Sequence, residues 1–370
     1  MKFVCIVAEY NPLHLGHVYH IAQSADRGDA VVVVMGGDFC QRGLSTVLDK
    51  YTRAAHAVKA GADVVVELPT LCTVNCAEQF AQGALRLVHA LPEAVLSFGS
   101  ECGDLAMLET TADCLADESV NARVHSLVDQ GVAYPKARQT ALDDYARRHN
   151  ISVADVGLPN NILALEYIKA NRGKCGMFTT RRTQNYHSDT PALSSAYIRQ
   201  AMQEGGDYTT LIPDYVKNDL HSATPEQTVL YLAALRRHDK PYYEGLLDAT
   251  EGLQNRVWQS ANACNTLTEA LENACTKRYT RARITRLFTA ALLDLRQSDL
   301  EVLQRAAPYF NVLAVRKDKL SILSALSQCG TILTSHAALS AHPMGQIDAK
   351  AHDIYRLLHA QDVPHTMQII

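Results

Sequence analysis

The chain has 370 residues, of which 47% are hydrophobic and 20% charged, and its formal net charge at pH 7 is −4. These values are typical of a soluble globular protein with room for two domains, and they exclude a disordered chain, a fibrous chain and a chain that is basic over its whole surface. No apolar run reaches the roughly 18 residues that a membrane-spanning helix needs, so we expect no association with a membrane.

The N-terminal segment MKFVCIVAEYNP lacks the small-residue cleavage site of a signal peptide, and we interpret it as a buried first strand. The ten cysteines are scattered without a CxxC pair, and the closest two, Cys72 and Cys76, are four residues apart. Scattered cysteines in a large chain indicate reduced thiols, so we expect a cytoplasmic protein without a structural zinc site.

Strand and helix patterns alternate over the first hundred residues. The apolar runs at 3–10, 30–37, 62–69 and 94–101 predict buried strands, and helices are predicted between them at 16–27, 49–60 and 76–90. Such alternation predicts parallel βαβ units in a sheet with helices on both faces. The polar segments EYNPLHLGH, GGDFCQRG, ELPT and FGSECGD follow the four strands, at the sheet edge where ligands bind in this architecture.

The pattern changes along the rest of the chain. Residues 104–172 are mostly helical, with a helix start at Pro159, and 176–182 predicts a fifth strand. A helix over 192–205 has Ser194 or Ser195 as its N-cap and Gly205 near its end. From about 206 the chain is largely helical, interrupted by one late strand at 309–318. We therefore predict an α/β fold: a Rossmann-like nucleotide-binding domain with a parallel sheet over residues 1–205, then a mainly α-helical domain over 206–370.

Three histidines stand in the segment VAEYNPLHLGHVYH, residues 7–20. A metal site would need further ligands, and no partner cluster is evident around His14, His17 and His20. The histidines could instead be core or cap residues. In a third interpretation, His14 and His17 flank Gly16 at the strand-to-helix turn and donate hydrogen bonds to phosphate oxygens near a helix N-terminus. One turn further on, His20 is interpreted as structural.

The HxGH pattern resembles the signature of the nucleotidylyltransferase superfamily, which is shared with class I aminoacyl-tRNA synthetases. Further motifs follow in the order found in the bacterial tRNA(Met) cytidine acetate ligase family: MGGDFCQRG, DKYTRAAHAVKAGADVVVELP, FGSE, PNNILALEYI, SSAYIRQAM, TKRYTRARITRL and YFNVLAV. Departures from the family pattern are Leu13 and Leu15 in the histidine motif and Ala196 in the serine motif. The resemblance covers most of the chain.

This resemblance implies an ATP-dependent ligase that activates acetate as acetyl-adenylate and then acetylates the wobble cytidine of elongator tRNA(Met). Mg²⁺ is expected as the counterion of ATP. Two alternatives are an adenylyltransferase that acts on a small metabolite and a tRNA-binding relative without catalytic activity. The oligomeric state is left open.

The resemblance also implies roles for individual residues. His14, His17 and Arg199 are the expected catalytic residues, because adenylate formation needs positioning and charge neutralisation at the phosphates. The expected nucleotide contacts are Val7, Ala8, Glu9, Tyr10, Asn11, Pro12, Leu13, His14, Leu15, Gly16, His17, Val18, Tyr19, His20, Gly99, Asn160, Arg182, Thr183, Ser194 and Ser195. For Gly99 and Asn160, ordinary turn chemistry is an alternative.

One group of side chains is expected to contact acetate or the incoming cytidine, and a second group is expected to contact tRNA. For both groups the alternative is solvated surface charge. The first group is Gln41, Arg42, Lys50 and Arg53. The second is a basic cluster on a helix whose other side is apolar: Lys277, Arg278, Arg281, Arg283 and Arg286. Cations of this kind bind the phosphates of RNA.

Overall fold

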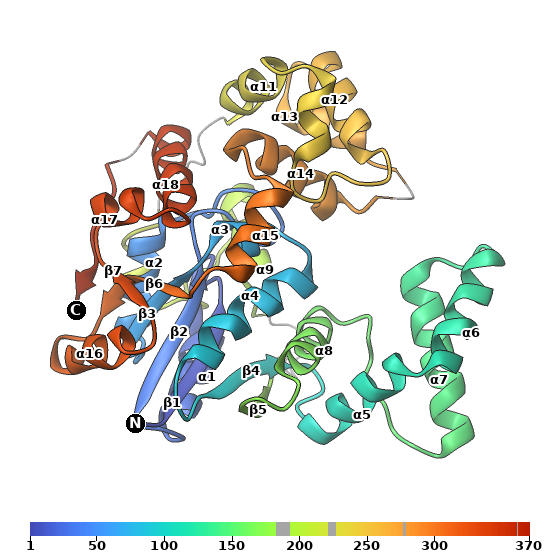
Figure 1. Ribbon diagram of the computed structural model, residues 1–370, viewed down its shortest axis with the longest axis horizontal. Helices are drawn as coiled ribbons and strands as arrows, with labels where there is room; N and C mark the ends of the chain where they lie inside the picture. Colours follow the sequence, from blue (N-terminus) through green and yellow to red (C-terminus); the bar gives the residue numbers. More distant parts are fainter. Residues whose placement is uncertain (183–192, 221–226, 277–278, 361) are drawn as a thin grey trace.

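The computed structural model describes residues 1–182, 193–220, 227–276, 279–360 and 362–370. In these ranges a central sheet has the strand order β5-β4-β1-β2-β3-β6-β7, with β8 beside β6 (Figure 1). Its strands are β1 Phe3–Ala8, β2 Ala30–Gly36, β3 Val64–Leu68, β4 Val95–Ser100, β5 Gly176–Arg181, β6 Tyr309–Val315, β7 Thr331–Leu333 and β8 Gln368–Ile369.

Helices surround the sheet, and two sets of them, α5–α7 and α11–α14, stand apart from it (Figure 1). Those of the first 217 residues are α1 Leu15–Ala25, α2 Lys50–Lys59, α3 Thr70–Thr73, α4 Ala77–Ala90, α5 Leu105–Ala116, α6 Glu118–Asp129, α7 Tyr134–His149, α8 Pro159–Asn171, α9 Ser195–Glu204 and α10 Asp214–Lys217. Those that follow are α11 Thr228–Arg236, the 3₁₀ helix η1 Lys240–Gly245, α12 Leu253–Ala263, α13 Leu267–Ala274, α14 Arg281–Leu293, α15 Gln297–Arg305, η2 Lys317–Lys319, α16 Ser321–Ser327, α17 His336–Ala341 and α18 Gly345–His359. The α5–α7 group projects to one side of the sheet, and α11–α14 form a separate group at one end of it.

The five strands from the first half of the chain are parallel, and β6 adds to β3 in antiparallel orientation. The order 3-2-1-4-5 reverses direction between β1 and β4, and ligands bind at such a reversal in open α/β sheets. The predicted α/β class is confirmed. The strand predicted at 309–318 was assigned to the helical second domain, but its pairing with β3 places it in the first sheet. The domain boundary at residues 205 and 206 stays a prediction.

Alternate residues of each central strand point to opposite faces of the sheet. Cys5, Val32 and Val64 pack in one core with α4 and α8. Their neighbours Ile6 and Val33 pack in a second core with α1 and α2. Both faces are therefore covered, which explains why these strands read as continuous apolar runs rather than alternating ones.

A loop after β2 joins the sheet to the α11–α14 group. Gly43 has a φ of 107°, and a Cβ there would lie 2.7 Å from the backbone nitrogen of Arg286. Thr289 on α14 donates a hydrogen bond from Oγ1 to the carbonyl of Gly43 at 2.8 Å. Only glycine allows this close approach, so α14 lies directly against the loop at the carboxyl edge of the sheet.

The guanidinium of Arg53 is fully buried below the same edge. It donates to the carbonyls of Glu9, Gly36, Gly37 and Leu48. Glu9 follows β1, and the two glycines end β2. One side chain therefore fixes the carboxyl ends of both central strands, and it satisfies carbonyls that would otherwise be buried without a donor.

A second set of buried charges lies beside Arg53. The Lys50 amine, fully buried, donates to both carboxylate oxygens of Glu67 at 2.9 and 2.8 Å. Asp38 accepts from the Lys50 backbone at 2.7 Å, and its other oxygen lies 2.8 Å from Nδ1 of His352 on α18. Burial alone would raise the pKa of Asp38, but His352, Lys50 and Arg53 lower it to about 2. The carboxylate therefore stays charged and connects α18 to the sheet.

No helix in the described part of the chain is both long and apolar enough to span a membrane.

Arg53→Met should lower the free energy of unfolding by about 3 kcal/mol or more, because several buried carbonyls lose their donor. Urea unfolding of R53M and the wild type measures this loss. The matched control is Arg42→Met, which changes an exposed arginine in the neighbouring loop and should shift stability by less than about 0.5 kcal/mol. Equal stabilities of R53M and R42M would contradict the role assigned to Arg53.

Candidate active site

The HxGH segment lies at the carboxyl end of β1, where the chain turns into α1. His14 is the N-cap of α1, and its Nδ1 accepts a hydrogen bond from the backbone N–H of Gly16 at 3.1 Å. Nδ1 of His17 accepts from the backbone N–H of His14 at 3.2 Å. The two rings are stacked, with centroids 3.6 Å apart. Both Nδ1 atoms are acceptors, so each neutral ring carries its hydrogen on Nε2.

The histidines are neutral at physiological pH. Burial, together with the charge of Arg182, lowers the pKa of His14 to about 3. Burial, the neighbouring histidines and Arg182 lower the pKa of His17 well below its usual value. Nε2 of His14 is buried and has no hydrogen-bond partner among the described residues. A buried donor without an acceptor is unfavourable, so this Nε2–H is a candidate donor to a ligand.

Gly16 is required by the close packing of this turn. A Cβ at Gly16 would lie 3.0 Å from Cε1 of His14 and 3.2 Å from Leu193. Any larger side chain would therefore displace the His14 ring. The backbone N–H groups of Leu15, Gly16 and His17 all donate to protein acceptors. These backbone groups are therefore already occupied, which leaves the imidazoles as the candidate donors to a phosphate.

Other residues of the 7–20 segment support this turn. The ring of Tyr10 packs edge-on against His17 with centroids 4.9 Å apart, and it is buried like Asn11, Pro12 and Leu13. Nε2 of His20 lies 2.8 Å from Oγ of Ser97 on β4, in agreement with its interpretation as a structural residue. Val7 and Ala8 end β1, Val18 is half-buried on α1, and Leu15 and Tyr19 face outward with 45% and 51% of their surface exposed.

Helix α9 lies against the segment that precedes His14. Oγ of Ser194 caps α9 by accepting from the N–H of Tyr197 at 3.2 Å. Ser195 donates from Oγ to the carbonyl of Pro12 at 2.9 Å, and Arg199 donates from Nη1 to the carbonyl of Asn11 at 2.6 Å. The structure therefore brings the predicted serine motif and Arg199 to the HxGH turn. Their contact with phosphate stays a prediction.

The predicted residues Gly99, Asn160 and Arg182 also meet at this edge. A Cβ at Gly99 would lie 3.2 Å from Cγ of Arg182, and Nη1 of Arg182 donates to Oδ1 of Asn160 at 3.1 Å. Arg182 is close enough to His14, His17 and His20 to lower their pKa values. Thr183 lies outside the described residues.

Glu101 was missed in the sequence analysis. Its carboxylate accepts from the side chain of Asn160 at 2.7 Å and from the backbone N–H of Asn161 at 2.8 Å, at the N-terminus of α8. The sequence feature that could have pointed to Glu101 is the start of α8. Leu158 and Pro159 provide no side-chain cap, so the first turn of this helix needs an acceptor from elsewhere. Glu101 therefore fixes the orientation of the Asn160 side chain.

Of the four residues predicted to contact acetate or cytidine, two lie in the loop after β2 and two are buried in the protein. Gln41 lies near the site, where its backbone N–H donates to Oε1 of Glu9 at 2.5 Å, and Arg42 is exposed. Lys50 and Arg53 do not face a substrate. Both are fully buried and bind protein groups, so the prediction that they contact acetate or cytidine is wrong.

The residues of the predicted basic cluster near α14 differ in their environments. Arg283 and Arg286 both form ion pairs with Asp248 at 3.2 Å, and Arg283 donates to Glu251 as well. Their charges are therefore largely neutralised within the protein, which weakens the prediction that they bind tRNA. Arg281 is exposed, and Lys277 and Arg278 lie outside the described residues. The predicted apolar side of the helix is confirmed, since Ile284, Leu287 and Phe288 are fully buried.

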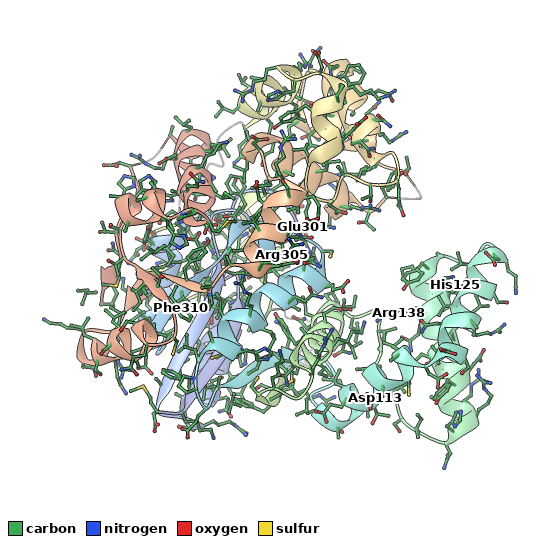
Figure 2. All side chains as sticks on the ribbon, viewed as in Figure 1. Asp113, His125, Arg138, Glu301, Arg305 and Phe310 are labelled. Carbon is green, nitrogen blue, oxygen red and sulfur yellow. The ribbon has the colours of Figure 1, made fainter. Side chains whose placement is uncertain are left out.

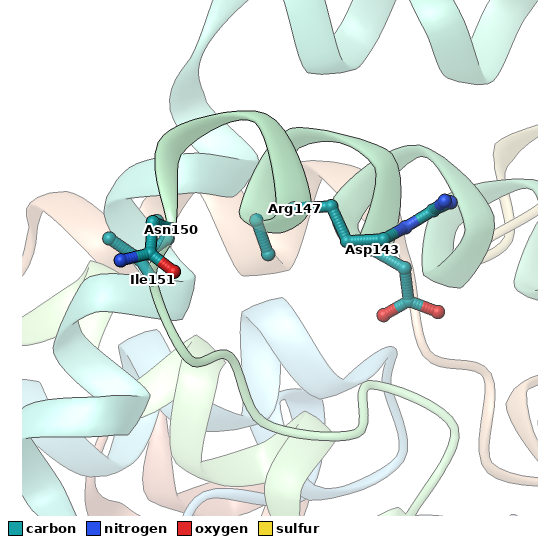
Figure 3. A pocket seen from close by; sticks show the side chains of 5 residues that line it. Asp143, Arg147, Asn150 and Ile151 are labelled. Carbon is teal, nitrogen blue, oxygen red and sulfur yellow. The ribbon is translucent and has the colours of Figure 1, made fainter.

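A hollow on the surface lies elsewhere, along α7. It is lined by Asp143, Ala146, Arg147, Asn150 and Ile151, none of which is a predicted site residue (Figure 3). No group of three His, Cys, Asp or Glu side chains in the described ranges is arranged to bind a metal ion. The HxGH turn combines a buried donor without a described partner, Nε2 of His14, with the positive charge of Arg182.

Comparison with known proteins gives consistent results. Residues 1–368 match the family described as HIGH Nucleotidyl Transferase. The tRNA(Met) cytidine acetate ligase of Bacillus licheniformis is 33% identical, with 96% of this chain and 92% of the relative covered. The enzyme of the same name from Acetivibrio thermocellus is 31% identical, with 90% and 87% covered. The crystal structure of Thermotoga maritima TmcAL bound with alpha-thio ATP is 25% identical, covers both chains fully and has a TM-score of 0.85.

The low pKa of His14 predicts sensitivity to acid. As the pH falls below 6.5, the unfolded chain takes up a proton on this histidine, whereas the folded chain does so only near pH 3, so stability is lost. For His14 alone the loss between pH 7 and pH 5 is about 2 kcal/mol. In His14→Asn, which keeps an N-cap acceptor, urea unfolding should show a smaller loss over this range.

His125→Asn is the control for this measurement, because His125 is exposed on the projecting helix α6 (Figure 2). It should keep the pH dependence of the wild type. A wild-type pH dependence in H14N would show that His14 is not buried as a neutral ring.

Proposed function

Because the chain belongs to the HIGH nucleotidyl transferase family, and within it to the tRNA(Met) cytidine acetate ligases, we propose that it uses ATP and acetate to form N4-acetylcytidine at the wobble position of elongator tRNA(Met). The enzyme is a ligase. We expect it to act in the cytoplasm, where its substrates are present together.

The pair of Nε2–H donors on His14 and His17 is the observation that supports this function most. Both rings are neutral, stacked and fixed through Nδ1 to the backbone, so they need no reorganisation before they donate to a phosphate. Arg182 adds positive charge close to both rings, and Arg199 is held at the carbonyl of Asn11 in the segment that precedes His14. Together these groups provide a prearranged site for a polyphosphate.

In the proposed first step, a carboxylate oxygen of acetate attacks the α-phosphorus of ATP. A bond between this oxygen and phosphorus forms as the bond to the β-phosphate oxygen breaks, and pyrophosphate leaves. The two Nε2–H groups stabilise negative charge that grows on the phosphate oxygens, and Arg199 neutralises the leaving pyrophosphate.

The nucleoside part of ATP would lie along β4. There the side chain of Arg182 packs over Gly99 and binds Asn160, which Glu101 holds in place. Mg²⁺ would bind mainly to the phosphates and water. The related Thermotoga maritima TmcAL structure is bound with alpha-thio ATP, which supports ATP as the nucleotide.

In the second step, the exocyclic amine of cytidine attacks the acetyl carbonyl. A bond between nitrogen and carbon forms, the anhydride bond to AMP breaks, and the amine loses a proton to solvent. The target base lies in a single-stranded loop, from which it can leave its stack at low cost.

Incubation with ATP and labelled acetate, with and without tRNA, tests the function. We expect label in tRNA(Met) only, together with release of AMP and pyrophosphate. Label without regard to tRNA identity, or no label in any RNA, would contradict the proposal. Transfer of AMP to a small metabolite would favour the alternative adenylyltransferase instead.

His17→Ala should reduce acetate-dependent exchange of pyrophosphate into ATP by about 100-fold or more, because one prearranged donor to the transition state is lost. Affinity for tRNA, measured by filter binding, should stay within about twofold. His125→Ala is the matched control on an exposed surface and should exchange pyrophosphate at the wild-type rate. Pyrophosphate exchange at the wild-type rate in H17A would contradict a catalytic role for His17.

A further inference from the structure

Three side chains beyond the end of α11 form a stack on the surface. The rings of His238 and Tyr242 are nearly parallel, with centroids 3.6 Å apart and 3° between their planes. The guanidinium carbon of Arg296 lies 4.1 Å from the centre of the Tyr242 ring. Two groups this close to one ring cannot share a face, so Tyr242 lies between Arg296 and His238. We refer to these three residues as the stacking platform.

The inner part of the platform is fixed by hydrogen bonds. The hydroxyl of Tyr242 donates to Oδ1 of Asp294 at 2.8 Å, and Nε of Arg296 donates to the same oxygen at 2.8 Å. Nη1 of Arg296 also donates to the carbonyl of Tyr242 at 2.9 Å. Little conformational freedom is left to Tyr242 and Arg296, so the platform is formed before any ligand binds.

His238 is the outermost member of the platform. Nε of Arg237 donates to Nε2 of His238 at 2.9 Å along the ring edge, which leaves the ring faces free of this contact. In the described part of the chain, no second ring lies against His238. Arg237 and Lys240 are exposed beside it and form no ion pair with a described residue. A flat ring is therefore presented next to two available cations.

The platform is connected to the sheet through α14. Asp294 is the C-cap of α14, and Thr289 on the same helix donates to Gly43 in the loop after β2. Five residues separate Thr289 from Asp294, which corresponds to about 7.5 Å along a helix. Asp294, which holds Tyr242 and Arg296, therefore lies on the same helix that packs against the loop after β2.

We propose that an unpaired base of the tRNA stacks on His238 and that Arg237 and Lys240 bind the adjoining phosphates. Proteins recognise single-stranded RNA by stacking bases on aromatic rings and contacting the backbone with cations. Arg283 and Arg286 are less suited to this task because Asp248 and Glu251 neutralise them. This inference rests on the proposed function, since it assumes that tRNA is the substrate.

Filter binding of a tRNA(Met) transcript at several salt concentrations tests the platform. His238→Ala should weaken affinity by about tenfold at every salt concentration, because the stacking of a base on the ring is lost. The slope of log affinity against log salt should stay that of the wild type. His238→Phe should restore affinity, because any flat aromatic ring can stack. Arg237→Ala should instead make the slope shallower by about 0.7 to 0.9, as expected for one lost phosphate contact.

His125→Ala, an exposed histidine on α6, is the control and should bind tRNA as the wild type does (Figure 2). Wild-type affinity in H238A, or a loss that H238F does not restore, would overturn the platform and leave the proposed function intact. Failure of the wild type to bind tRNA(Met) would contradict the proposed function itself. The two failures are therefore distinguishable.

Discussion

The guanidinium of Arg53 connects the parts of the molecule on which the site depends. It joins the carbonyl of Glu9, which follows β1, to the carbonyls of Gly36 and Gly37 at the end of β2. The segment after β1 leads within five residues to His14, and the segment after β2 leads to Gly43, against which α14 packs. A single buried cation thus sets both the HxGH turn and the docking of the helical group at one edge of the sheet.

The charge state of the two histidines follows from their position at this edge of the sheet. The histidines are buried beside Arg182, so they are neutral and donate through Nε2 rather than carry charge. Positive charge comes from the arginines that flank them. This division suits phosphate chemistry, because neutral donors can be buried without a counterion, whereas a buried imidazolium would need one. The same logic applies at the surface: arginines paired with Asp248 are poor phosphate ligands, whereas Arg237 and Lys240 form no ion pair with a described residue.

Much of the fold could be predicted from local pattern. The parallel strands, the helix start at Pro159 and the cap at Ser194 depend on residues close in sequence, and the structure contains them. The partners of Lys50, Arg53 and Arg283 could not be predicted. Asp248 is 35 residues from Arg283 in sequence, and the stack of His238 with Arg296 also spans distant segments. The local sequence around a charged residue is the same whether its side chain is exposed or buried in an ion pair, so only the tertiary structure distinguishes the two cases.

The central claim is that the neutral pair His14 and His17 binds the α-phosphate at the carboxyl end of β1. A crystal structure of this protein with an ATP analogue that resists cleavage between the α- and β-phosphates tests it most directly. We expect an α-phosphate oxygen within about 3 Å of Nε2 of His14, the second imidazole on the same phosphate group, and the nucleoside near Gly99. A nucleotide bound with its phosphates away from both rings, with Nε2 of His14 facing a protein acceptor, would contradict it.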